Sequence, residues 1–134
     1  MLNKSFLIIR DVEGKGRGVF TSRGLRKGEL VEVCPMLVFN TKERELLDQT
    51  LLYNYMFLWG EDDSQSALAL GYGSLYNHSS APNVRYLVDY ENETLEVHTV
   101  RDIAPGEELC FNYNGDPTDT TPVWFEEGFD KVLR

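Results

Sequence analysis

Short apolar runs alternate with polar turns along most of this chain, which is the pattern of a mostly β protein with few short helices. Leu7 to Val12 is expected to form a strand. It ends at Gly14 to Gly18, where three alternating glycines favour a turn and argue against a strand interior or a stable helix. Leu30 to Val33 and Met36 to Phe39 are expected to be two further strands, separated by Pro35.

The second half of the chain continues the β pattern. Val84 to Tyr90 and Thr94 to Val100 are rich in β-branched and aromatic residues, and the short polar segment between them predicts a hairpin. A turn at Pro105-Gly106 leads into a last strand, Glu108 to Tyr113. The sequence shows no repeat, linker or domain boundary, so we expect one domain.

One helix is predicted, and it begins after Asn40. Asn40 is a good N-cap, and Glu43 stands three residues later, where a capping box needs it. Leucines at three-to-four spacing predict that the helix continues with an apolar face, formed by Leu46, Leu47, Leu51 and Leu52.

Composition and charge narrow the classes of partner. The 134 residues fit one domain, 42% of them are hydrophobic, and no apolar run approaches the roughly 20 residues of a membrane span. The N-terminus lacks the pattern of a signal peptide, so an intracellular protein is expected. With 22 acidic and 13 basic residues the net charge is -9, which disfavours nucleic acid and suits a basic protein, although solubility alone also explains it.

The two cysteines, Cys34 and Cys110, are far apart in the sequence and flanked by apolar residues. We expect both to be buried core thiols, and no metal site is predicted. His98 stands on a predicted strand without a ligand pattern around it, so a structural role is expected.

Three segments carry candidate chemistry. The glycines of the first, Gly14 to Gly18, do not form a phosphate-binding loop, because no Gly-Lys-Ser/Thr follows, and a simple β-turn explains them equally well. The second, Tyr76 to Asn83, contains an Asn-His pair that offers donors and acceptors to a polar ligand, with an Asx-turn as the alternative. The third, Gly106 to Tyr113, ends in a tyrosine, and a tyrosine at a strand end is usually a packing residue.

Taken in order, the three segments resemble the SET-domain signature. That signature has a GxG segment, then Asn-His-Ser-x-x-Pro-Asn, then Glu-Leu-x-Phe-Asx-Tyr after a turn, and the likeness covers about residues 5–114. Two departures stand out. Ser80 occupies a position where many relatives have cysteine, and no cysteine-rich, zinc-binding segment follows the last motif.

The resemblance implies a fold of several small β-sheets, in which the strand ending at Tyr113 passes beneath the loop of Asn77 and His78 in a knot-like crossing. It implies one SET domain over residues 1–134, with residues 115–134 as a tail that closes the substrate channel. Six residues would bind S-adenosylmethionine, namely Lys15, Gly16, Arg17, Gly18, Asn77 and His78.

The resemblance also implies methyl transfer to a lysine amine of a protein, with Tyr113 and Tyr55 as catalytic residues. For Tyr55 a core aromatic is an equal alternative. The channel would be lined by Phe111, Tyr86, Trp124 and Phe125, although the last two equally suit a hydrophobic tail packed on the core.

The expected substrate is a basic, lysine-containing segment, with a histone as one candidate, and a homodimer is compatible with the sequence. Phe111 stands two residues before the catalytic tyrosine, where the family sets the number of methyl groups, so di- or trimethyl-lysine is expected. A core side chain on a buried strand is the alternative for Phe111, because its neighbours Leu109 and Cys110 are apolar. A SET module that binds peptides without catalysis is the alternative from a different class. Methylation of something other than a protein lysine is the second alternative.

Overall fold

Two β-sheets account for most of the computed structural model, which describes residues 6–113 and 118. Neighbouring strands of the four-stranded sheet are β1 (Leu7–Val12), β2 (Gly16–Thr21), β9 (Glu108–Phe111) and β6 (Asn77–His78). Neighbouring strands of the five-stranded sheet are β4 (Met56–Trp59), β5 (Gln65–Ala69), β3 (Leu30–Phe39), β8 (Thr94–Thr99) and β7 (Val84–Asp89). The prediction of a mostly β fold is therefore confirmed.

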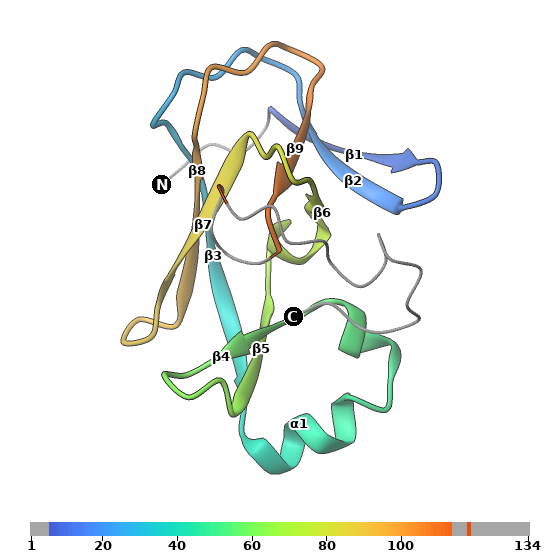
Figure 1. Cartoon of the computed structure of the whole chain (residues 1–134), viewed down its shortest axis with the longest axis vertical. Helices are drawn as coiled ribbons and strands as arrows, with labels where there is room; N and C mark the ends of the chain where they lie inside the picture. The colour runs from blue at the N-terminus through green and yellow to red at the C-terminus, as the bar shows by residue number, and fades with distance from the viewer. Residues whose placement is uncertain (1–5, 114–117, 119–134) are drawn as a thin grey trace.

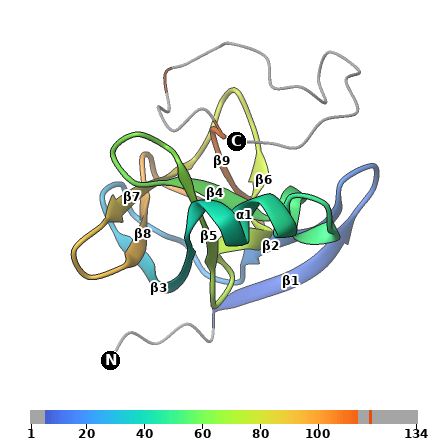
Figure 2. The ribbon, with the colours of Figure 1, turned by 90° about the horizontal axis from the view of Figure 1, so that it is seen from below.

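The one α-helix among the described residues, α1 (Thr41–Leu47), lies beside β4 and β5 at one end of the molecule (Figures 1 and 2). The β1–β2 hairpin projects to one side in the upper half of Figure 1, with β9 beside it and β6 just below. Two short 3-10 turns, η1 (Leu51–Asn54) and η2 (Gly73–Leu75), connect the strands. Within the described ranges, no helix is long and apolar enough to cross a membrane.

The glycine-rich segment forms the turn of the β1–β2 hairpin and also the start of β2. Gly14 and Gly16 have φ angles of 78° and 80°, which glycine adopts without strain, and the amide of Lys15 donates to the carbonyl of Val12 at 3.0 Å. The prediction that these glycines are excluded from a strand interior is wrong for Gly18, which lies inside β2. The reason is close packing, described below.

The segments expected as two strands on either side of Pro35 form one ten-residue strand, β3. The prediction of a break at Pro35 is wrong, because β3 changes partner there. It pairs with β8 as far as Pro35 and with β5 from Met36 onward. The missing amide proton of proline therefore falls where no regular ladder bond requires it.

The predicted capping box of α1 is confirmed. The amide of Glu43 donates to Asn40 Oδ1 at 2.8 Å, and the amide of Asn40 donates to Glu43 Oε1 at 3.0 Å. The predicted apolar face is wrong, because α1 ends at Leu47, and Leu46 of α1 and Leu51 of η1 are largely exposed, at 65% and 71%. A helix of seven residues at the edge of a sheet is too short to cover a core.

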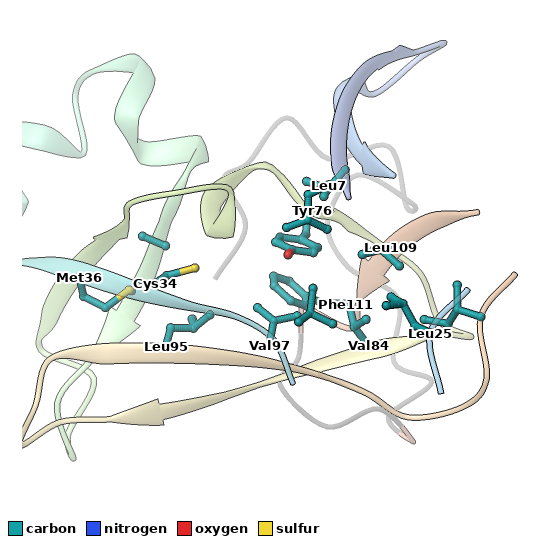
Figure 3. Packing of buried hydrophobic residues seen from close by; sticks show 14 of the residues in the cluster. Leu7, Leu25, Cys34, Met36, Tyr76, Val84, Leu95, Val97, Leu109 and Phe111 are labelled. Carbon is teal, nitrogen blue, oxygen red and sulfur yellow. The ribbon is translucent and has the colours of Figure 1, made fainter. Parts of the chain in front are cut away.

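The core lies between the two sheets, and many of its residues are branched aliphatic side chains of β3, β7, β8 and β9 (Figure 3). Cys34 is fully buried there, as predicted, but Cys110 is only half-buried. The prediction for Cys110 is wrong because neighbouring strand residues point to opposite faces, and its neighbours Leu109 and Phe111 take the core side of β9. Burial still raises the pKa of the Cys110 thiol to about 12.

Candidate functional site

The second and third motifs lie side by side because β6 and β9 pair in parallel. Asn77 is opposite Cys110 and His78 is opposite Phe111, and the amide of Ser79 extends the contact by donating to the carbonyl of Phe111 at 2.8 Å. A parallel pair needs a long connection, and the β7–β8 hairpin supplies it. The segment that would complete the knot-like crossing, residues 114–117, lies outside the described residues.

The first motif, the glycine-rich segment, lies next to the other two because β2 pairs with the other edge of β9. All three motifs then meet at the side chain of Asn77. Its Nδ2 donates to the carbonyl of Arg17 at 3.1 Å and to Glu108 Oε2 at 2.7 Å. Because both hydrogens of the amide are used in this way, the orientation of Asn77 is fixed from two strands at once.

Gly18 is required by this approach. A Cβ atom at position 18 would lie 2.9 Å from Asn77 Nδ2 and 2.9 Å from Val12 Cγ2, closer than carbon atoms of side chains normally come. The glycine therefore lets β2 pack directly against the Asn77 amide. Gly18 thereby allows the hairpin residues and Asn77, which are all predicted to bind the cofactor, to lie next to each other.

One cation of the β1–β2 hairpin, Lys15, contacts the Asn-His segment, and a second, Arg17, is its near neighbour in the sequence. The ammonium of Lys15 donates to the carbonyl of His78 at 3.3 Å, and Arg17 follows two residues later at the start of β2. Both side chains are exposed. The site thus combines positive charge with the acceptor oxygen of Asn77, a set that matches a ligand carrying both a carboxylate and an ammonium group.

The side chain of His78 holds the last strand. Its Nδ1 accepts a hydrogen bond from the amide of Tyr113 at 3.0 Å, and the two rings lie 5.2 Å apart. Since an amide can donate only to an unprotonated nitrogen, this bond selects the tautomer of His78 with a bare Nδ1. The His78 side chain is 2% exposed, and its hydrogen bond to the amide of Tyr113 anchors the end of β9.

The hydroxyl of Tyr113 donates to the carbonyl of Tyr76 at 2.8 Å. Burial raises the pKa of Tyr113 above its usual range, and the neighbouring groups of Cys110, Glu108 and Tyr55 raise it further. Tyr113 is therefore a neutral phenol at ordinary pH. Tyr55, the other tyrosine predicted as catalytic, directly follows η1.

The predicted channel residues Phe111 and Tyr86 belong to an aromatic cluster, which we define as Phe57, Tyr76, Tyr86 and Phe111. Phe111 stacks on Tyr76 at 4.5 Å, and the edge of Tyr86 meets both Phe111 at 5.0 Å and Phe57 at 5.3 Å. Phe111 is 1% exposed, and burial raises the pKa of Tyr86 to about 12. Trp124 and Phe125 lie outside the described residues, as does the tail to which they belong.

Two residues that the sequence analysis left without a role complete the site. Glu108 orients Asn77, and Asn83 uses its amide to bind two peptide groups of β9. Asn83 Nδ2 donates to the carbonyl of Glu108 at 2.8 Å, and Asn83 Oδ1 accepts from the amide of Cys110 at 2.9 Å. Both residues stand inside the recognised motifs, so their position in the sequence was a usable signal. His98, in contrast, pairs with Glu96 at 2.9 Å on β8, in keeping with a structural role.

The family model of the SET domain matches residues 16–114 of this chain. A histone-lysine N-methyltransferase of Schizosaccharomyces pombe, specific for histone H3 lysine-37, is 40% identical over 132 residues, which are 98% of this chain and 84% of the relative. A histone H3 lysine-36 specific enzyme of Cryptococcus neoformans is 30% identical over 78% of this chain and 13% of its own length.

Solved structures agree with the fold. A Plasmodium falciparum protein, described as a candidate histone methyltransferase, is 29% identical with a TM-score of 0.63, covering 84% of this chain and 95% of its own. A polycomb repressive complex 2 chain bound to S-adenosylmethionine has a TM-score of 0.67 at 20% identity, and the match spans 80% of this chain and 15% of that one. The likeness to the second structure concerns the fold alone.

Proposed function

The chain belongs to the SET-domain family and is an S-adenosylmethionine-dependent protein-lysine methyltransferase, and from this premise we propose that its substrate is histone H3. The observation that carries the proposal is the 40% identity to an enzyme specific for histone H3 lysine-37 over 98% of this chain. A second relative acts on the adjacent lysine-36. We therefore propose that the target is lysine-36 or lysine-37 of histone H3. Because histone H3 is part of chromatin, we also propose that the enzyme acts in the nucleus.

The cofactor site we propose consists of the β1–β2 hairpin and the Asn-His segment. S-adenosylmethionine, when bound, supplies an electrophilic methyl group on a positively charged sulfur. Lys15 and Arg17 offer cations to its carboxylate, and Asn77 offers Oδ1 to its ammonium, because the Nδ2 hydrogens already bind Arg17 and Glu108. Since the His78 ring anchors Tyr113, we assign the contact of His78 with the cofactor to its backbone.

Tyr113 is proposed to orient the attacking amine. Its hydroxyl donates to the carbonyl of Tyr76, and we assign its oxygen the role of acceptor for the lysine amine. The raised pKa of Tyr113 excludes a role as an ionised base at ordinary pH. The lysine amine has a pKa near 10.4 in water, so desolvation in the channel must lower this pKa until the proton passes to solvent water and the neutral amine enters. The main contribution to the rate is then that the site holds the amine in line with the bond between the methyl group and the sulfur.

The proposed channel is lined by Tyr55, Tyr86 and Phe111, with Trp124 and Phe125 of the tail as its outer wall. An aromatic lining desolvates the amine and tolerates its methylated, cationic forms. Phe111 carries no hydroxyl that would hold a water where a methylated amine needs space, so di- or trimethyl-lysine is the proposed product. The net charge of -9 favours the approach of a basic histone tail.

The test uses the full chain, tritiated S-adenosylmethionine and histone H3 peptides that span lysines 36 and 37. Matched peptides have arginine at one lysine or the other, which keeps the charge and removes the acceptor amine. Transfer that is lost with one replacement identifies the target. Transfer to neither peptide, with other proteins methylated, would refute the histone H3 proposal. No transfer at all with cofactor binding retained would indicate a peptide-binding module.

Light scattering on the same sample tests the homodimer.

A further inference from the structure

A glutamate lies in the core, beneath the site just described. Glu32 of β3 is 0% exposed. A β-bulge between Leu30 and Glu32 interrupts the pairing with β8, so Val31 and Glu32 are both buried although neighbouring residues of a strand normally point to opposite faces. A carboxylate in such a place is costly unless hydrogen bonds compensate it, and its contacts therefore indicate why it is kept.

The carboxylate of Glu32 contacts both ends of η2. Its Oε1 accepts from the hydroxyl of Tyr76 at 2.8 Å, and its Oε2 lies 3.5 Å from the amide of Tyr72. Tyr72 immediately precedes η2 and Tyr76 immediately follows it. The turn also packs closely on β3, because a Cβ atom at Gly73 would lie 2.9 Å from Cys34 Sγ. One carboxylate thus fixes the turn that leads into Asn77 and His78.

Tyr76 connects this buried carboxylate to the reacting side of the molecule. Its ring is held between Glu32 at the hydroxyl and the stacked ring of Phe111 at 4.5 Å, and Figure 3 shows these two rings face to face. Its backbone carbonyl accepts the hydroxyl of Tyr113 at 2.8 Å. The chain of contacts runs from the Glu32 carboxylate through one residue to the proposed catalytic hydroxyl.

We propose that Glu32 is a positioning residue for methyl transfer, acting through Tyr76 on the Tyr113 hydroxyl. The carboxylate fixes the Tyr76 side chain, the fixed side chain sets the direction of the Tyr76 carbonyl, and that carbonyl orients the hydroxyl. An apolar residue at position 32 would fill the space but would supply no directional bond. The proposal rests on the role proposed for Tyr113 and is independent of which protein is the substrate.

The kinetic test compares Glu32→Leu, Glu32→Gln and Tyr76→Phe in the full chain. Glu32→Leu and Tyr76→Phe should lower kcat by about tenfold to a hundredfold, as a small misplacement of reacting groups does, with cofactor Kd unchanged within about threefold. Glu32→Gln retains an acceptor oxygen and should restore most of the rate. The control is Thr99→Val, which removes part-buried hydrogen bonds to Arg26 and Glu29, neither of which belongs to η2, and should leave kcat unchanged.

A double-mutant cycle separates positioning from a general loss of stability. In a Tyr113→Phe background there is no hydroxyl left to orient, so Glu32→Leu should cause little further loss of kcat. The same fold loss in both backgrounds would overturn the proposal. If Glu32→Leu does not fold, Tyr76→Phe takes its place in the cycle, since it removes only the hydroxyl that binds Glu32.

A second readout needs no substrate, so it stands even if histone H3 proves to be the wrong target. The carbon next to the hydroxyl of Tyr113 can be labelled with carbon-13, and its resonance is assigned by its absence in Tyr113→Phe. Glu32→Leu should move this resonance in the folded chain, whereas Thr99→Val should not. A Tyr113 resonance that stays in place in both variants would refute the connection from Glu32 to the hydroxyl.

Discussion

Asn77 and Glu108 lie 31 positions apart in the sequence, yet Asn77 Nδ2 is 2.7 Å from Glu108 Oε2. This bond joins the Asn-His motif to the last strand and, with the Arg17 carbonyl, uses both hydrogens of the amide. The acceptor oxygen of Asn77 is thereby presented in one direction. The binding chemistry of the site depends on a contact that neither motif contains by itself.

Asn77→Ala should weaken the binding of S-adenosylmethionine by about 10-fold to 100-fold, since polar groups of the ligand and of Glu108 lose their partner. Calorimetry on chelator-treated protein measures this, and binding by the wild type after chelation tests at the same time that no metal is needed. The matched control is Asn92→Ala in the exposed turn between β7 and β8, which should leave Kd unchanged. Equal affinity of Asn77→Ala and wild type would remove Asn77 from the cofactor site.

Gly18→Ala should both destabilise the fold and weaken cofactor binding. The added Cβ would stand 2.9 Å from Asn77 Nδ2, so β2 or Asn77 must shift, at a cost of about 1–3 kcal/mol in the free energy of unfolding. Gly24→Ala is the matched control, because its Cβ would lie at an ordinary 3.6 Å from the carbonyl of Ile103. Urea unfolding and calorimetry measure the two effects. Unchanged cofactor affinity in a folded Gly18→Ala would separate β2 from the binding site.

Tyr113→Phe should lower kcat by about 10²-fold to 10³-fold, since removing one oriented group from an active site has effects of this size. Cofactor Kd should stay within about threefold, because the hydroxyl is assigned to the chemical step. Single-turnover transfer of tritium measures the rate. If the variant keeps most of its turnover, another residue must orient the amine.

Phe111→Tyr should shift the product toward monomethyl-lysine while turnover continues. The new hydroxyl enters the aromatic cluster beside Tyr86 and can hold a water in the space that a methylated amine would use. Because it also buries a polar group, we expect a loss of about 1–3 kcal/mol in stability. Mass spectrometry of peptide over a time course resolves the products, with Phe39→Tyr on β3 as control. A wild type that stops at one methyl group with excess cofactor would contradict the assignment.

The buried tyrosines predict a loss of stability in alkali. Burial raises the pKa of Tyr86 from 10.0 to about 12 in the folded chain. Between these values the folded chain keeps a proton that the unfolded chain has lost, so the free energy of unfolding falls as pH rises through this window. Urea unfolding between pH 10 and about pH 12 measures the slope, and Tyr86→Phe should make it shallower. An unaltered slope would show that the Tyr86 hydroxyl is not protected by burial.

Local chemistry allowed the sequence to predict some elements well. The capping box of Asn40 and Glu43 and the β7–β8 hairpin depend on bonds between near neighbours, so their residues suffice to identify them. The motif order also identified the family before any fold was known. Strand β4, Met56–Trp59, was missed, because a four-residue apolar run next to a helix has no period that separates strand from helix.

The tertiary structure alone decided which distant groups meet. Pro35 lies within a continuous strand because β3 changes partner there, and Glu32 is buried because a bulge rotates it inward. The Asn77–Glu108 bond follows from the parallel pairing of β6 with β9, a pairing set by the path of the whole chain. Sequence thus determined the chemical groups of the site, since each is a property of its residue. Their orientation depends on contacts between segments distant in the chain, and only packing fixes these.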